Sequence, residues 1–266
     1  YFTSDSLTLM DDIFMTAVFQ NSLPCVDLVL QIILEKPNLR ATRVVTQGTL
    51  KNLHGHDVRL DIHAFADGQE FNIEIQRAKR GAEPRRARYH SSMMDARELQ
   101  KGEEVTELPE TYVVFITEKD VLGKGLSRYH IERTIKETGE GFGDRSHIIY
   151  VNGTIQDETP LGRLMHDFFC QDAEKMYYEE LRNRASFFKN EEGGRVEMCK
   201  IMDEIRQEGV NWGMERDRLE SLRTIMQTMR LSEDEAMNAL YKLEQDRVIG
   251  EYFNKLRAKA NVKYLR

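Results

Sequence analysis

The segment from Val58 to Gln76 constrains the fold of this chain more than any other, because two alternating runs flank a tight-turn signal. It reads VRLDIHAFADGQEFNIEIQ, and Asp-Gly between alternating apolar and polar residues is the strongest short-range indication of a two-residue hairpin. With Asp67 and Gly68 as the loop, the register pairs three sets of apolar residues: Leu60 with Ile75, Ile62 with Ile73, and Ala64 with Phe71. A slip of one residue would oppose apolar to polar positions along the ladder, so the pattern predicts this antiparallel register.

The same register places Asp61 opposite Glu74 on the other face, with Gln76 two residues along that face. Directly opposed residues have Cβ atoms about 4.5–5.5 Å apart, which is destabilising for two like charges. A divalent cation such as Mg²⁺ offsets that repulsion, since it binds one or two carboxylates and keeps waters that a phosphate can replace. The pattern therefore predicts a metal site at Asp61 and Glu74; the alternative is two solvated residues on an exposed sheet face.

The rest of the chain predicts a mixed α/β fold with helices around a sheet. One helix follows Asp11 and Asp12, whose charge suits a helix N-terminus. The other predicted elements are helices over Val26–Glu35 and Arg85–Gln100 and strands over Ala41–Leu50, Thr111–Thr117 and His147–Val151. The unbroken apolar run of Thr111–Thr117 favours a central strand, and the stretch before His147, with Gly139, Gly141 and Gly143, is expected to be a loop.

A run of basic residues follows the hairpin, and it is the candidate for local contact with nucleic acid. Its members are Arg77, Lys79, Arg80, Arg85, Arg86 and Arg88. The formal net charge of −7 opposes binding of nucleic acid by overall charge, because non-specific affinity depends on Lys and Arg neutralising phosphates. Any DNA contact must therefore be local, and a solvated helix face is the alternative interpretation.

The length of 266 residues suits one core with an appendage, and the composition changes near residue 190. We expect one domain over residues 1–190 and a helical C-terminal extension over residues 191–266, because the pattern is almost wholly helical beyond Glu192-Gly193-Gly194. Its apolar stripe packs on its own core or supports dimerisation or partner binding, and both readings stay open.

The cysteines and the hydropathy pattern indicate a cytoplasmic protein without a membrane span. Cys25, Cys170 and Cys199 are scattered without the spacing of a zinc site or a disulfide framework. His54, His56 and His63 have no cysteine partner nearby in the sequence, which disfavours zinc. No stretch of about 18 apolar residues is present.

The order of these features resembles the PD-(D/E)XK nuclease superfamily, and within it the nuclease-family transposases, also called recombination-promoting nucleases. The resemblance runs from about Leu9 to Phe169 and is carried by the phrases RLDIHAFADGQEFNIEIQ, RRARYHSSMMDA, LPETYVVFIT and HIIYVNG. It implies a restriction-endonuclease-like core, in which a mixed central sheet is flanked by helices.

The resemblance also assigns roles to individual residues. It implies that Asp61 and Glu74 bind the metal, Mg²⁺ with Mn²⁺ as a substitute, and that Asp12 completes the site, with Asp11 as the close alternative. Gln76 stands where the superfamily signature usually has Lys, and a neutral amide can orient a water but cannot supply positive charge. Arg77, Arg86, Arg88 and Tyr89 are the candidate DNA-binding residues.

Two functions of different classes follow from this sequence. The first is a metal-dependent DNA endonuclease that hydrolyses phosphodiester bonds and serves recombination or mobile elements, with a homodimer through the C-terminal helices as a further expectation. The second is a catalytically weak or inactive nuclease-fold module that binds DNA or protein, which the replacement of Lys by Gln76 favours.

Overall fold

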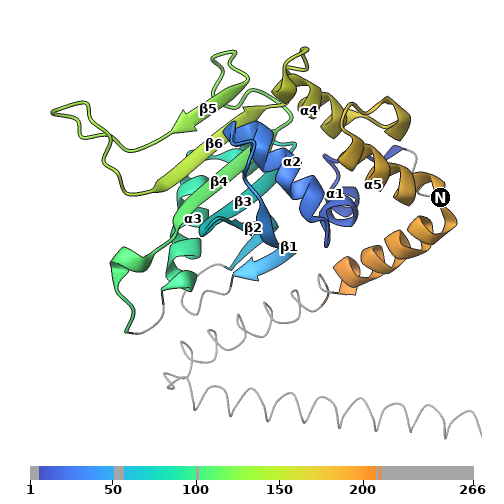
Figure 1. Cartoon of the computed structure of the whole chain (residues 1–266), viewed down its shortest axis with the longest axis horizontal. Helices are drawn as coiled ribbons and strands as arrows, with labels where there is room; N and C mark the ends of the chain where they lie inside the picture. The colour runs from blue at the N-terminus through green and yellow to red at the C-terminus, as the bar shows by residue number, and fades with distance from the viewer. Residues whose placement is uncertain (1–5, 51–56, 100–101, 208–209, 211–266) are drawn as a thin grey trace, which may run out of the picture. The chain divides into compact units, whose positions relative to one another are not determined.

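The computed structural model of the chain describes residues 6–50, 57–99, 102–207 and 210 (Figure 1). Residues 1–202 form one compact unit and residues 203–266 form a second, and every element named below belongs to the first. The division into residues 1–190 and 191–266 stays a prediction. Residues 192–202 are helical, and Met198 and Ile201 from this stretch are buried. His54, His56 and the C-terminal apolar stripe beyond residue 210 lie outside the described residues.

The first unit alternates between helices and strands along the chain. In order, the elements are α1 (Asp12–Phe19), α2 (Leu23–Leu34), β1 (Ala41–Leu50), β2 (Val58–Ala66), β3 (Gln69–Gln76), the 3₁₀ helix η2 (Lys79–Ala82), α3 (Pro84–Glu98), the 3₁₀ helix η3 (Val105–Glu107), β4 (Glu110–Thr117), β5 (Arg128–Ile131), β6 (Ser146–Asn152), α4 (Pro160–Phe169), the 3₁₀ helix η4 (Ala173–Lys175) and α5 (Glu179–Asn190).

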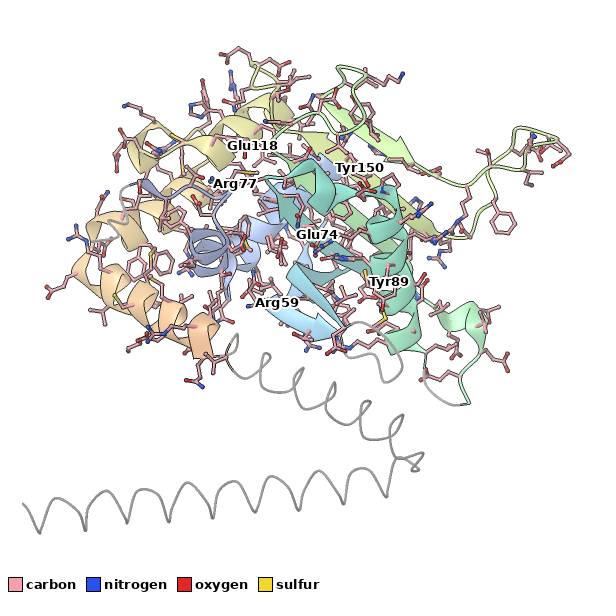
Figure 2. The ribbon with its side chains drawn as sticks, turned by 180° about the vertical axis from the view of Figure 1, so that it is seen from behind. Arg59, Glu74, Arg77, Tyr89, Glu118 and Tyr150 are labelled. Atoms are coloured by element: carbon pink, nitrogen blue, oxygen red, sulfur yellow. The ribbon has the colours of Figure 1, made fainter. Side chains whose placement is uncertain are left out.

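The strands form one mixed sheet in the order β1-β2-β3-β4-β6-β5. The pairs β3–β4 and β4–β6 are parallel, whereas β1–β2, β2–β3 and β5–β6 are antiparallel. Helix α3 covers one face of the sheet, and α1 and α2 lie over the other (Figures 1 and 2). This arrangement confirms the predicted α/β class with a mixed central sheet flanked by helices.

The ladder of the central hairpin has the predicted register from Ile62–Ile73 to the turn, and the predicted pair of Leu60 with Ile75 lies outside it. Ile62 pairs with Ile73 and Ala64 with Phe71, and the ladder closes at Ala66 and Gln69. The two loop residues have positive φ, 50° at Asp67 and 72° at Gly68, as a type I′ turn requires. Asp and Gly tolerate this backbone better than other residues, so local chemistry fixes the register that positions the candidate site.

Strand β4 is central, as its apolar run predicts. It lies between β3 and β6, and the residues of Thr111–Thr117 are all buried. On the face covered by α3, Val113 and Phe115 pack in one apolar cluster with Met94 of the helix and Tyr150 of β6. The ring of Phe115 stacks on that of Tyr150 with 5.3 Å between centroids.

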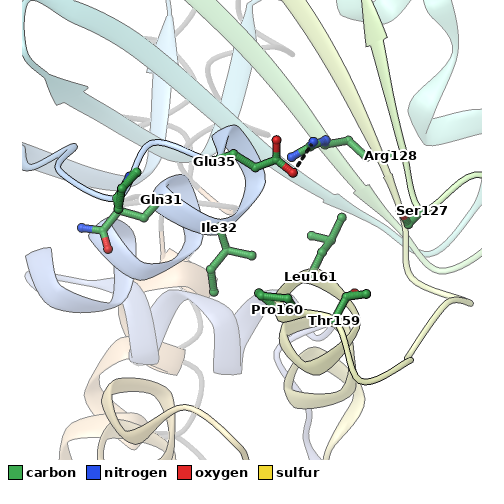
Figure 3. A pocket seen from close by; sticks show the side chains of 9 residues that line it. Gln31, Ile32, Glu35, Ser127, Arg128, Thr159, Pro160 and Leu161 are labelled. Atoms are coloured by element: carbon green, nitrogen blue, oxygen red, sulfur yellow. Dashed lines mark ion pairs between the residues drawn. The ribbon is translucent and has the colours of Figure 1, made fainter.

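Strand β5 was not predicted, since the whole stretch before His147 was expected to be a loop. It has only four residues, lies at the sheet edge and is partly exposed, so its alternation of polar and apolar residues is too short to stand out in the sequence. Long-range contacts hold it: Arg128 pairs with Glu35 at 2.8 Å and donates to the carbonyl of Ile33. Beside this ion pair, α2 and the start of α4 border a hollow of about 440 Å³ (Figure 3), which no residue of β2, β3 or α3 lines.

Within the described residues, no single helix is long and apolar enough to cross a membrane. Helices α1 and α2 meet the length and composition requirement only together, as a pair bent by 107°.

Candidate functional site

The candidate site lies on a polar row of β3 that the fold buries. Alternation along the strand places Glu70, Asn72, Glu74 and Gln76 on one face, and the side chains of the first three have no exposed surface. Because β3 lies between β2 and β4 and α3 covers this face, the row cannot be solvated. Polar residues are seldom fully buried without a specific partner, so the structure excludes an exposed sheet face for Glu74.

Asp61 and Glu74 lie close together just beyond the ladder of β2 and β3, where the predicted register would pair them. The backbone N–H of Ile75 donates to Oδ2 of Asp61 at 2.9 Å, and the backbone N–H of Asp61 lies 3.4 Å from Oε1 of Glu74. Each carboxylate thus contacts the backbone of the opposite strand just beyond the last pair of the ladder, Ile62 and Ile73. The two acids that the sequence paired are therefore brought together at one point of the sheet.

The contacts of Glu74 are all long for a buried carboxylate. Besides the Asp61 amide, Oε1 lies 3.5 Å from Nδ1 of His90, while Oε2 lies 3.5 Å from Nε2 of Gln76 and 3.7 Å from Nη2 of Arg86. Hydrogen bonds to a carboxylate are usually about 2.7–2.9 Å long, and a buried charge needs close partners. The side chain of Glu74 is thus poorly compensated by its described neighbours.

Asp61 shows the electrostatic consequence of this crowding. Burial is the first cause that raises the pKa of its carboxyl well above the usual range, and the charge of Glu74 is the second. The charge of Asp12 also raises this pKa, whereas Arg86 lowers it. Acidic side chains from three elements, α1, β2 and β3, therefore act on one another at this point, which favours binding of a proton or a cation.

Comparison with known proteins agrees with the geometry. Residues 31–154 match the model of the family described as PD-(D/E)XK nuclease family transposase. Over these residues the chain is similar to the PD-(D/E)XK nuclease family transposases. Searches of curated proteins and of solved structures gave no match. The matched residues include β2, β3 and α3, and the mixed sheet flanked by helices is consistent with a PD-(D/E)XK restriction-endonuclease-like fold.

The PD-(D/E)XK signature usually has Lys at the end of the second site strand, where this chain has Gln76. The Gln76 amide points back toward Glu74 and is held next to Gly81 of η2. A Cβ atom added at Gly81 would lie 1.9 Å from Oε1 of Gln76, so the absence of a side chain there gives the amide its space. The side chain that the resemblance aligns with the usual Lys is thus a neutral donor next to Glu74.

The structure gives different surroundings to Asp11, which precedes α1, and Asp12, which is its first residue. Both carboxylate oxygens of Asp11 have close partners. Its Oδ2 accepts from the Thr8 amide at 2.8 Å, and its Oδ1 pairs with Arg77 at 3.0 Å. The side chain of Asp12 is exposed, and its negative charge contributes to the raised pKa of Asp61. The geometry therefore favours Asp12 over Asp11 as the third acid, and neither residue lies within the family match.

The four candidate DNA-binding residues occupy different environments. Arg86, Arg88 and Tyr89 are exposed on α3, and Arg86 also approaches Glu74. Figure 2 shows Glu74 near the centre of this face, with Tyr89 and Arg77 on opposite sides of it. Arg77 differs because its guanidinium contacts the segment before α1. Nothing in the structure tests DNA binding by these four residues, which stays a prediction.

Two residues of the site were not predicted, Asn72 and His90. The side-chain amide of Asn72 lies 3.0 Å from Nδ1 of His90, which in turn lies 3.5 Å from Glu74. A third buried histidine contact, between Nε2 of His63 and Oε1 of Glu70 at 2.5 Å, continues the polar row. The unbroken polar alternation of β3 could have indicated Asn72, but no sequence pattern places His90 of α3 above it.

The donor atoms at the site suit a hard divalent cation. Across the described ranges of the chain, no three His, Cys, Asp or Glu side chains are arranged to hold a metal ion by themselves. Mg²⁺ does not require such a set, because it commonly binds one or two carboxylates and completes its shell with waters and substrate phosphates. The poorly compensated Glu74 and the neighbouring Asp61 fit this requirement.

Proposed function

We propose that the chain is a metal-dependent endonuclease that hydrolyses phosphodiester bonds of DNA and serves recombination or mobile elements. The observation that carries the proposal is the Asp61–Glu74 pair, which lies within the family match, with Glu74 fully buried and its cationic neighbour Arg86 no nearer than 3.7 Å. The similarity of residues 31–154 to the PD-(D/E)XK nuclease family transposases supports nuclease chemistry. Strand transfer forms no part of the proposal.

Each residue of the site has a defined task in the proposed reaction. Asp61 and Glu74 would hold the divalent cation, with the charge of Asp12 adding to the site. A bound Mg²⁺ supplies an acidified water and neutralises charge on the phosphoryl oxygens. Gln76 would orient the attacking water through its amide, and Arg86, Arg88 and Tyr89 would hold the DNA backbone from the exposed side of α3.

The proposal predicts cleavage that depends strictly on the metal. Purified protein should nick supercoiled plasmid at least about 100-fold faster with Mg²⁺ or Mn²⁺ than in EDTA, since metal assistance is worth several kcal/mol. The measurement is the rate of conversion of supercoiled to nicked and linear DNA, repeated on linear duplex and single-stranded substrates. Absence of cleavage of every DNA form with both metals would favour the second candidate, a binding module.

That second candidate is favoured by the neutral amide of Gln76 at the position of the usual Lys. A module of this kind would bind DNA or protein through the same face without turnover. Retardation of labelled DNA in a gel, unchanged by Mg²⁺ and accompanied by no cleavage, would be its signature.

Gly81→Ala provides a test of the Gln76 amide. The new methyl group would collide with Oε1 of Gln76, and we expect this flexible amide to move while the fold is retained, which should lower kcat about tenfold because a positioned donor is lost. Plasmid-nicking rates and the melting temperature provide the readouts. Gly141→Ala is the matched control, since no atom lies within 4 Å of its added Cβ. Wild-type turnover by Gly81→Ala would argue against a role for the amide.

A further inference from the structure

Arg77 crosses from the end of β3 to the segment that leads into α1. It follows Gln76 directly, and its Nε donates to the carbonyl of Met10 at 3.2 Å. Its Nη2 contacts Oγ1 of Thr8 at 3.3 Å and Oδ1 of Asp11 at 3.0 Å. One guanidinium thus binds three acceptors spread over four residues of this segment.

The segment is also tied to itself and to the core. The second carboxylate oxygen of Asp11 accepts from both the amide and the hydroxyl of Thr8, at 2.8 and 3.1 Å. Leu9 and Met10 are buried between these polar contacts. Thr8, Asp11 and Arg77 therefore form a closed polar ring, which fixes the backbone immediately before Asp12.

The ring has a consequence for the cation site. Asp12 is the first residue of α1, and its charge acts on Asp61 although its side chain is exposed. An exposed acid on a helix terminus keeps a defined distance to its target only if the preceding backbone is held. Arg77 supplies three of the contacts that hold it, and its chain neighbour Gln76 contacts Glu74.

We infer that Arg77 is a positioning residue that seats Asp12 at the cation site through Asp11, and that it is not a contact for DNA phosphate. The inference rests on the proposed function for its catalytic consequence. About half of the Arg77 side chain is exposed, 52%, so exposure alone would allow a phosphate contact. The geometry opposes it, because a guanidinium that turned toward DNA would give up its carboxylate partner and two further acceptors.

Substitution of the two ends of the ion pair separates these roles. Arg77→Gln and Asp11→Asn should each lower kcat about tenfold at saturating DNA and leave KM within about twofold. Because both substitutions break the same ion pair, the kcat of the double variant should equal that of the less active single variant. Arg77→Lys should resemble Arg77→Gln, because a Lys ammonium keeps the charge but not the fork of donors. If Arg77 instead bound phosphate, Arg77→Gln would raise KM, Arg77→Lys would be nearly active and Asp11→Asn would have no effect.

Arg88→Gln serves as the comparison for a DNA contact, since it makes the same chemical change on the exposed side of α3. It should raise KM and reduce the salt dependence of DNA binding while leaving Mn²⁺ binding unchanged.

A second readout is the affinity for Mn²⁺, measured by electron paramagnetic resonance without DNA. Arg77→Gln, Asp11→Asn and Asp12→Asn should each weaken it about three- to tenfold. Wild-type Mn²⁺ affinity in both Arg77→Gln and Asp11→Asn would overturn the inference.

Failure of the proposed function would be recognised separately. If the wild type neither cleaves DNA nor binds Mn²⁺, the proposed function is wrong. Amide hydrogen exchange of residues 8–12 then tests separately whether Arg77 holds the backbone before Asp12. Faster exchange there in both Arg77→Gln and Asp11→Asn supports the positioning of this segment by Arg77. Unchanged exchange in Arg77→Gln overturns it.

Discussion

Glu74→Gln is expected to reduce metal-dependent DNA cleavage by at least about 100-fold, because it removes one negative charge from the cation site and preserves the shape of the side chain. A hundredfold loss corresponds to about 3 kcal/mol of transition-state stabilisation, which is within the several kcal/mol that a bound metal supplies. The contacts of Glu74 with the Asp61 amide, His90, Gln76 and Arg86 are all 3.4–3.7 Å long. Little native hydrogen bonding therefore depends on its charge, and the variant should fold.

The measurement compares plasmid-nicking rates of the variant and the wild type across a Mg²⁺ series, with DNA binding measured in Ca²⁺. We expect DNA affinity within about threefold of wild type, since Glu74 has no exposed surface and the proposed DNA contacts are the exposed residues of α3. Glu132→Gln is the matched control, because its carboxylate is 59% exposed and pairs with His147 at the other end of the sheet. Retention of wild-type, Mg²⁺-dependent cleavage by Glu74→Gln would exclude Glu74 as a metal ligand.

The parts of the fold that the sequence predicts correctly are those fixed by local chemistry. The positive φ angles of Asp67 and Gly68 follow from the Asp-Gly pair itself, and the alternation on both sides of it then sets the register. The central position of β4 follows from an uninterrupted apolar run in the same way. Because Asp61 and Glu74 are placed by this register, their approach is predictable from the sequence.

The remainder depends on contacts between distant segments. β5 forms by pairing with β6, and Arg128 ties it to the end of α2. The alternation in RYHI is only four residues long and is a weak indication of a strand by itself. His90 is placed over Asn72 by the packing of α3 on the sheet, and the sequence shows only an unremarkable helical residue. Arg77 illustrates the limit best, because its basic run suggests DNA while its partners Thr8 and Asp11 lie 69 and 66 positions earlier.

Asp61→Asn is expected to stabilise the metal-free protein at neutral pH while abolishing cleavage. Burial and the charge of Glu74 raise the folded-state pKa of the Asp61 carboxyl, so the folded state binds the Asp61 proton more tightly than the unfolded state does. That contribution to stability is fully present below the unfolded pKa and is lost as pH rises through the folded pKa. At higher pH the ionised pair opposes folding, and Asn removes this cost.

The geometry suits an amide at position 61. The carbonyl oxygen of Asn can accept the Ile75 N–H that Asp61 now accepts, and its NH₂ can donate to Glu74. We therefore expect a gain of about 1–2 kcal/mol in the free energy of unfolding in EDTA at pH 8, the usual size of the penalty for a poorly satisfied buried polar group. The gain should vanish near pH 4, where the wild-type carboxyl carries its proton and resembles the amide.

Mg²⁺ should reverse the order of the two proteins. It binds the folded wild type and stabilises it by mass action, whereas Asp61→Asn lacks one of the two anionic ligands and should gain little. Urea unfolding from pH 4 to pH 8, with EDTA or with Mg²⁺, measures both effects. A variant that is less stable than wild type in EDTA at pH 8 would show that the two carboxylates do not repel each other, and the case for a cation between them would lose its physical basis.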